Sequence, residues 1–207
     1  GDIYILDCGL KYPENELLGI DIVIPDFSYL RENADRIVGV FLTHGHADAI
    51  GAWPYLLNEF NGPGRGSELT IELAKIQLQK DPKAKNFNDF HIINEKTEID
   101  FGTVTVSFFR TTHSIPDSMG IVLQTSAGEV VYTGDFKFDP TAAGDYQTDF
   151  ARLAEIGSKG VLALLSDSAN AENYEQPVSE REIAAYVLET FKYHPGRIIV
   201  ASVASNI

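Results

Sequence analysis

Five expected strands of this sequence each end in an aspartate or a histidine, and this pattern constrains the fold more than any other feature. The residues at these strand ends are Asp7, His44, His113, Asp135 and Asp167. Polar residues at one edge of a sheet are where α/β proteins usually keep their sites. The pattern therefore predicts an α/β fold whose site is assembled from distant segments.

Alternating apolar residues and β-branched content predict the strands, and helical spacing predicts the helices. Strands are expected at residues 2–7, 21–25, 37–43, 89–94, 103–111, 120–125, 129–134, 160–167 and 197–202. Helices are expected at residues 28–35, 50–60, 67–80, 148–157 and 179–193. Ser67 and Ser179 are expected N-caps, the second with Glu182 in a capping box. The segment "SAGE" is expected to turn a hairpin.

Helices arrive singly and in pairs among the strands, so both hairpins and crossovers are needed. Two mixed sheets flanked by helices fit this order better than a regular alternating sheet. The stretch "NGPGRGSEL", residues 61–69, has three glycines and a proline where a short strand would stand. We interpret it as a mobile loop or as a join across missing residues. The chain starts without Met and stops just after an expected strand, which suggests a fragment.

The formal net charge of −14 over 207 residues argues against a broad nucleic-acid-binding face. Any nucleic-acid function needs positive charge from bound metal, from a local basic patch or from further chain. Cys8 is the only cysteine and has no partner for a disulfide, which fits a reducing cytoplasm. We interpret it as a small buried residue. No apolar run approaches the roughly 20 residues of a membrane-spanning helix.

The segment "THGHAD" places three ligand types at spacing two: His44, His46 and Asp48. Zinc and similar ions take imidazole and carboxylate ligands, and catalytic sites keep one position open. Gly45 allows the two histidines to approach each other. Taken alone, an HxH pattern is equally compatible with a surface or packing feature. His91 and His194 lack neighbours at ligand spacing, and we interpret both as structural or solvated.

Four ordered motifs resemble the metallo-β-lactamase superfamily: an early aspartate at a strand end, an HxHxDH-like segment, a later histidine and a later aspartate. They stand here as Asp7, "HGHADA", His113 and Asp135. The segments "LDCGLKYPENELLGIDIVIPDFSYL", "THSIPDSMGIVLQT", "GDFKFDPT", "LLSDSANAE" and "PGRIIVASVASNI" are similar to the ribonuclease J family of the β-CASP branch. The resemblance covers nearly the whole chain except "NGPGRG". It implies an αββα sandwich over residues 1–170, incomplete at its C-terminal side, and the beginning of a β-CASP domain over residues 171–207.

The resemblance also implies a role for each motif residue. It assigns a first metal to His44, His46 and His113, places Asp48 at a second metal, and lets Asp135 bridge both. Catalytic roles are implied for Asp48, His46 and Asp135, with zinc as the expected metal and manganese or magnesium as alternatives. It further implies a supporting role for Asp7, the start of the β-CASP motif series at Asp167, and a place near the substrate entrance for Ser114 and Asp117.

One departure from the family pattern bears on activity. Ala49 stands where HxHxDH ends in histidine, and Ala47 stands where glutamate is usual. The resemblance implies an RNA 5′→3′ exonuclease and endonuclease of the cytoplasm, acting in RNA processing and mRNA decay. Loss of a ligand at Ala49 predicts a weak second site and low or absent catalysis, as in the family's divergent second paralogue type, although engineered inactivation is a rival explanation.

Two other functions remain open on the sequence alone. One is a non-catalytic, RNA-binding subunit that forms homo-oligomers or hetero-oligomers with an active paralogue. The other is a small-molecule metallohydrolase of the same fold, against which the β-CASP-like sequence from Leu164 onward argues.

Overall fold

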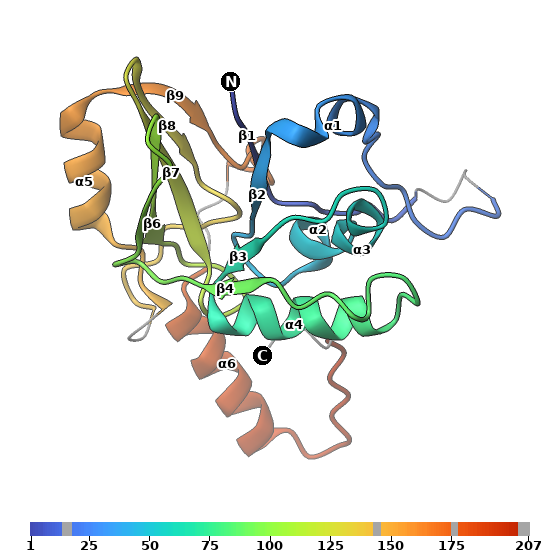
Figure 1. The fold of residues 1–207 in the computed structure, drawn as a ribbon. Helices are drawn as coiled ribbons and strands as arrows, with labels where there is room; N and C mark the ends of the chain where they lie inside the picture. The colour runs from blue at the N-terminus through green and yellow to red at the C-terminus, as the bar shows by residue number, and fades with distance from the viewer. Residues whose placement is uncertain (14–17, 143–145, 175–177, 203–207) are drawn as a thin grey trace.

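The structure is a computed structural model that describes residues 1–13, 18–142, 146–174 and 178–202 (Figure 1). The strands are β1 (Ile3–Leu6), β2 (Ile37–Phe41), β3 (Gly64–Gly66), β4 (Phe90–Ile92), β5 (Glu98–Asp100), β6 (Val104–Arg110), β7 (Met119–Thr125), β8 (Gly128–Tyr132) and β9 (Val161–Leu165). The helices are α1 (Ser28–Glu32), α2 (Ala47–Ile50), α3 (Trp53–Leu57), α4 (Glu68–Gln79), α5 (Phe150–Lys159) and α6 (Glu180–Tyr193), with a 3-10 helix at Ala34–Arg36.

The strands form two sheets, as the sequence predicts. The first has the order β1-β2-β3-β4 and the second the order β5-β6-β7-β8-β9. In the first sheet every pairing is parallel, because helices connect its consecutive strands. The prediction that this sheet is mixed was therefore wrong. The second sheet is mixed: its first three pairings are antiparallel, and the crossover through α5 makes β8 and β9 parallel.

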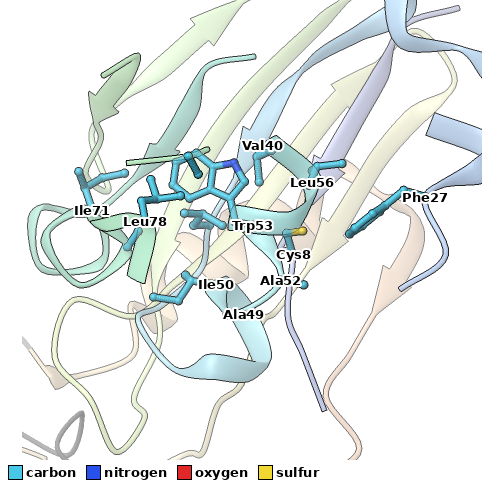
Figure 2. Packing of buried hydrophobic residues seen from close by; sticks show 13 residues of the cluster. Cys8, Phe27, Val40, Ala49, Ile50, Ala52, Trp53, Leu56, Ile71 and Leu78 are labelled. Carbon is cyan, nitrogen blue, oxygen red and sulfur yellow. The ribbon is translucent and has the colours of Figure 1, made fainter. Parts of the chain in front are cut away.

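Three clusters of buried side chains divide the fold into four layers, which confirms the predicted αββα sandwich. One cluster lies between the first sheet and its helices, with Trp53 at its centre (Figure 2). The second fills the space between the sheets and includes Phe41 and Phe108. In the third, Ile156 of α5 packs on the outer face of the second sheet. Helix α6 has no buried residue among those described and extends away from the sandwich (Figure 1).

The glycine-rich stretch at residues 61–69 contains a strand, so its interpretation as a mobile loop or broken join was wrong. Strand β3 pairs with β2 on one side and β4 on the other. A Cβ at Gly64 would lie 2.1 Å from the Trp53 ring. The missing side chain lets the indole lie directly on the strand, so the glycine that weakens the strand signal is required for packing.

Other boundaries differ from the sequence prediction for local reasons. Residues 21–25 form only an isolated bridge between Lys11 and Val23, and residues 197–202 form no strand. The expected helix at residues 50–60 is split, because Pro54 is accepted only in a first turn and a new helix begins at Trp53. Strand β5 was not predicted, since three residues give too short a pattern.

The predicted caps and hairpin were confirmed. Ser67 and Ser179 cap α4 and α6, the second with the expected capping box. Strands β7 and β8 pair directly across the "SAGE" turn. No helix in the described part of the chain has both the length and the apolar character to cross a membrane.

Candidate metal centre

The connection from β2 to α2 carries the first group of predicted ligands. His46 is the N-cap of α2 and Asp48 lies in its first turn. His44 is buried, whereas the Asp48 side chain is 57% exposed, so the loop runs from the core to the surface. A Cβ at Gly45 would lie 2.4 Å from Leu73 Cδ1 of α4. Gly45 thus lets Leu73 pack closely against the turn.

His113, from the loop after β6, completes a cluster of three imidazoles. The ring centroids of His44, His46 and His113 lie 4.8 to 5.0 Å from one another. His46 Nδ1 and His113 Nε2 are 3.1 Å apart. The Nε2 atoms of His44 and His46 are buried and have no hydrogen-bond partner among the described residues. Buried polar atoms without partners are rare, so they point to something that the protein binds there.

Two carboxylates lie against this cluster. Asp135, from the loop after β8, has Oδ2 at 3.5 Å from His113 Nε2 and at 3.9 Å from His44 Nε2. Asp48 Oδ2 is also 3.9 Å from His44 Nε2. The ligand atoms of two groups, His44–His46–His113 and His44–Asp48–Asp135, each lie within 4.8 Å of one another. His44 belongs to both groups, and Asp135 of the second group also lies near His113 of the first; its role as a bridging ligand stays a prediction.

The surroundings of the cluster hold His44 and His113 neutral. Burial and, after it, the neighbouring His113 lower the pKa of His44 to about 3. Burial and His46 lower the pKa of His113 as well. Burial, reinforced by Asp48 and Asp167, raises the pKa of Asp135 to about 6. At neutral pH His44 and His113 therefore keep a free lone pair, and the Asp135 carboxylate is mostly ionised, which is the state required of metal ligands.

Asp7, at the end of β1, supports His44 through Thr43. Its carboxylate accepts hydrogen bonds from Thr43 N at 2.7 Å, Thr43 Oγ1 at 2.8 Å and the Tyr132 hydroxyl at 2.9 Å. The Thr43 hydroxyl gives its one proton to Asp7, so its oxygen accepts from His44 Nδ1 at 2.9 Å. This chain fixes the His44 tautomer with a bare Nε2 facing the cluster. Sequence reasoning missed both Thr43 and Tyr132.

The backbone after β1 fixes helix α2, and with it Asp48. Asp7 adopts a φ of +59°. The chain then runs along α2, and the amides of Cys8 and Leu10 donate to the carbonyls of Ala49 and Ala47 at 2.7 and 3.0 Å. A Cβ at Gly9 would lie 1.5 Å from the Asp48 carbonyl oxygen. Glycine is required at position 9 because two backbones touch there.

Ala49 is 1% exposed and belongs to the apolar cluster around Trp53. Figure 2 labels it beside Ile50 and Ala52. Its methyl group offers no ligand atom. The described residues therefore supply three nitrogens to the first group and only one to the second, with the carboxylates of Asp48 and Asp135.

The remaining predicted site residues lie at different distances from the cluster. Asp167, after β9, is near enough to act on the charges of His44, His113 and Asp135. Ser114 is exposed and lines a cavity that also contains His113. Asp117 lines a separate cavity beside the start of α4. Their place near a substrate entrance stays a prediction.

The donor set fits a divalent transition metal. Imidazoles with carboxylates suit zinc, and the buried, unpartnered Nε2 of His44, which lies 3.9 Å from carboxylate oxygens of Asp48 and Asp135, is a ligand atom that a bound ion would satisfy. The nearby Lys137 is paired with Glu180 and Asp139, so it does not compete for the cluster carboxylates.

Comparison with known proteins is consistent with this geometry. Residues 1–176 match the family model described as the metallo-beta-lactamase superfamily. The chain is 58% identical to ribonuclease J 2 of Streptococcus pyogenes serotype M3 and 47% identical to ribonuclease J 2 of Staphylococcus aureus strain NCTC 8325, over 99% of its own length in each case. It spans 37% of the length of these relatives.

A solved protein of unknown function from Enterococcus faecalis V583 shares the fold. The TM-score is 0.54 at 16% identity, over 74% of this chain and 39% of that chain.

Proposed function

Since the chain belongs to the metallo-beta-lactamase superfamily and has ribonuclease J 2 homologues, we propose that it serves a metal-dependent RNA phosphodiesterase of the ribonuclease J type. The single observation that carries the proposal is the convergence of three imidazoles and two carboxylates from separate strand ends. The alternative of a small-molecule hydrolase has no comparable support among these homologues. We place the protein in the cytoplasm, in RNA processing and mRNA decay.

Each cluster residue has a separate task in this proposal. His44, His46 and His113 hold the first ion, zinc by preference and manganese or magnesium otherwise, while Asp48 and Asp135 serve a second. Bound divalent ions activate water for attack on phosphorus and neutralise phosphate charge. This charge offsets the net charge of −14 where RNA approaches. Asp135, whose Oδ2 lies 3.5 Å from His113 Nε2 and 3.9 Å from His44 Nε2, would hold its ionised carboxylate against the bound ion.

We further propose that catalysis is weak. The second group has one imidazole where the family pattern provides another at position 49. Loss of a supporting group near a metal typically costs 10–100-fold in affinity or activity, and loss of a direct ligand should cost more. A second candidate function follows from the same observation: a weakly catalytic or non-catalytic RNA-binding subunit, in homo-oligomers or in hetero-oligomers with an active paralogue.

Metal content and cleavage separate these candidates. Zinc or manganese equivalents are measured together with degradation of a 5′-monophosphorylated RNA, using Asp135→Asn as the inactive control. Two equivalents of metal per chain together with rapid RNA degradation would contradict the proposal of a weakened site. If the chain binds no metal and cleaves no RNA, the role of a non-catalytic subunit is favoured.

Ala49→His tests the cause of weakness. We expect this change to raise metal occupancy and cleavage together. If neither rises in a folded variant, the missing imidazole is not the reason for low activity. Hydrolysis of nitrocefin or of a glutathione thioester would instead favour a small-molecule enzyme.

A further inference from the structure

A cavity of about 480 Å³ opens beside His113, between the loops after β6 and β8 and the start of α6. Its volume lies within the range of small-ligand sites, roughly 300–1,000 Å³. His113 lines it, and Nε2 of this residue is within 3.5 Å of both His46 Nδ1 and Asp135 Oδ2. A molecule in the cavity therefore lies next to the candidate metal centre.

An exposed aromatic ring is presented on one wall. Tyr146 lines the cavity and is 39% exposed. Its carbonyl oxygen accepts a hydrogen bond of 2.6 Å from Thr112 Oγ1, and Thr112 is also bonded to Thr148 through backbone and side chain. The backbone that carries the ring is thus fixed to the end of β6. A half-exposed ring on a fixed backbone is suited to stacking against a flat group.

A cation also lines the cavity. Arg181, in the first turn of α6, lines the cavity and makes no ion pair with any residue that the structure describes. Helix α6 is attached to the sandwich at this point, because Asp139 Oδ2 accepts from the Glu180 amide at 2.7 Å. Among the described residues that line the cavity, Glu180 is the one acid, and Lys137 pairs with it.

We propose that this cavity binds one nucleotide of a single-stranded RNA, with its base stacked on Tyr146 and a phosphate against Arg181. The inference rests on the proposed function and adds a substrate subsite to it. Aromatic rings and guanidinium groups are the pair of features that proteins use to hold unpaired nucleotides. Ser114 also lines the cavity and offers a hydroxyl to the sugar or phosphate. In a chain with a net charge of −14, Arg181 supplies a local positive charge where the RNA phosphate would lie.

The test measures RNA binding without metal. A fluorescein-labelled single-stranded RNA is titrated in EDTA, and anisotropy gives Kd at several salt concentrations. Tyr146→Ala should weaken binding at least about fivefold, whereas Tyr146→Phe should keep the affinity. Tyr174→Ala is the matched control, because Tyr174 is 99% exposed and lies outside the cavity.

Arg181 is tested by the salt dependence. Arg181→Ala should reduce the slope of log K against log salt by about 0.7, the value for one phosphate of a single strand. Arg197→Ala is the control from the exposed end of the chain. Equal affinities for Tyr146→Ala and Tyr174→Ala overturn the proposal, as does an unchanged slope in Arg181→Ala or a lack of RNA binding by the unaltered chain. Arg181 is exposed, so its replacement does not disturb the core.

Failure here is distinguishable from failure of the proposed function. Zinc stoichiometry is measured on the same samples without RNA. Tyr146-dependent RNA binding in a chain that takes no zinc would support the subsite and refute the metal centre. Full zinc occupancy and RNA cleavage that are insensitive to Tyr146→Ala would support the metal centre and refute the subsite.

Discussion

Replacement of Asp7 by asparagine should weaken zinc binding without touching any predicted ligand. In the unaltered chain the Thr43 hydroxyl donates to Asp7 Oδ2 and accepts from His44 Nδ1. The asparagine amide nitrogen donates to the Thr43 oxygen, so the hydroxyl proton turns toward His44 Nδ1. The His44 proton then moves to Nε2, which is the buried atom that faces the cluster. The change exchanges the binding tautomer for a non-binding one.

The expected loss follows from the cost of such supporting contacts. Partners that orient a metal-bound histidine are typically worth 10–100-fold in affinity, which corresponds to about 1.4–2.7 kcal/mol. The assay is a competition titration of zinc against a chromophoric chelator at pH 8. The pKa of Asp7 is raised to about 7 by burial, so at this pH the carboxylate is mostly ionised.

Two variants show whether the effect passes through Thr43. Thr43→Val removes the hydroxyl and should weaken zinc binding as Asp7→Asn does. Thr43→Ser keeps the hydroxyl and should bind zinc as tightly as the unaltered chain. Tyr132→Phe removes one donor to Asp7 but leaves the contact between Thr43 and His44, so it should cost less. Nitrogen chemical shifts of His44 report the tautomer directly. The reasoning is refuted if Asp7→Asn binds zinc as tightly as the unaltered chain while the His44 proton remains on Nδ1.

Three further predictions concern stability. The pKa of Asp7 rises from 3.8 to about 7 on folding, so the folded metal-free chain holds a proton there that the unfolded chain has lost, and the contribution of Asp7 to stability should fall between about pH 4 and pH 7, whereas the lowered pKa of His44 contributes in the opposite direction. At 1.36 kcal/mol per pH unit the fall is on the order of 4 kcal/mol, and urea titrations of Asp7→Asn should show this slope removed. Gly9→Ala should lower both Tm and zinc affinity, because the added Cβ would lie 1.5 Å from the Asp48 carbonyl oxygen. Gly157→Ala is the control: a Cβ there has nothing within 4 Å, so the change should stabilise α5. Equal Tm changes in the two variants would contradict the argument. Ala49→His should lower the unfolding free energy of the metal-free chain by about 1–3 kcal/mol through overpacking; an unchanged urea midpoint would show that the imidazole lies outside the core.

The strands that end at the candidate site were predictable from the sequence. Local alternation and β-branched content identify the strands that precede His44 and His113, because each pattern is contained in a few consecutive residues. The short distances between these histidines and Asp135 agree with the prediction that such strand ends meet. Whether they hold zinc stays a prediction.

The glycine-rich strand shows where the sequence fails. Gly64 carries no propensity for a strand, and only the Trp53 ring that lies against it explains why glycine stands there. Its partner β4 lies more than twenty residues further along the chain, so no local window contains the pairing. The same holds for β5, whose three residues become a strand only beside β6.

What the sequence determined by itself was the set of chemical groups and the periodic segments that carry them, because residue type and local spacing need no partner. What only the tertiary structure decided was how those groups are supported. The Thr43 hydroxyl meets Asp7 across 36 residues and the Tyr132 hydroxyl meets it across 125. Only the folded chain shows that the Ala49 methyl group belongs to the core. The same is true of Tyr146 and Arg181, which line one cavity. A hydrogen bond or a packing contact depends on distance in space, and spacing along the chain does not specify that distance.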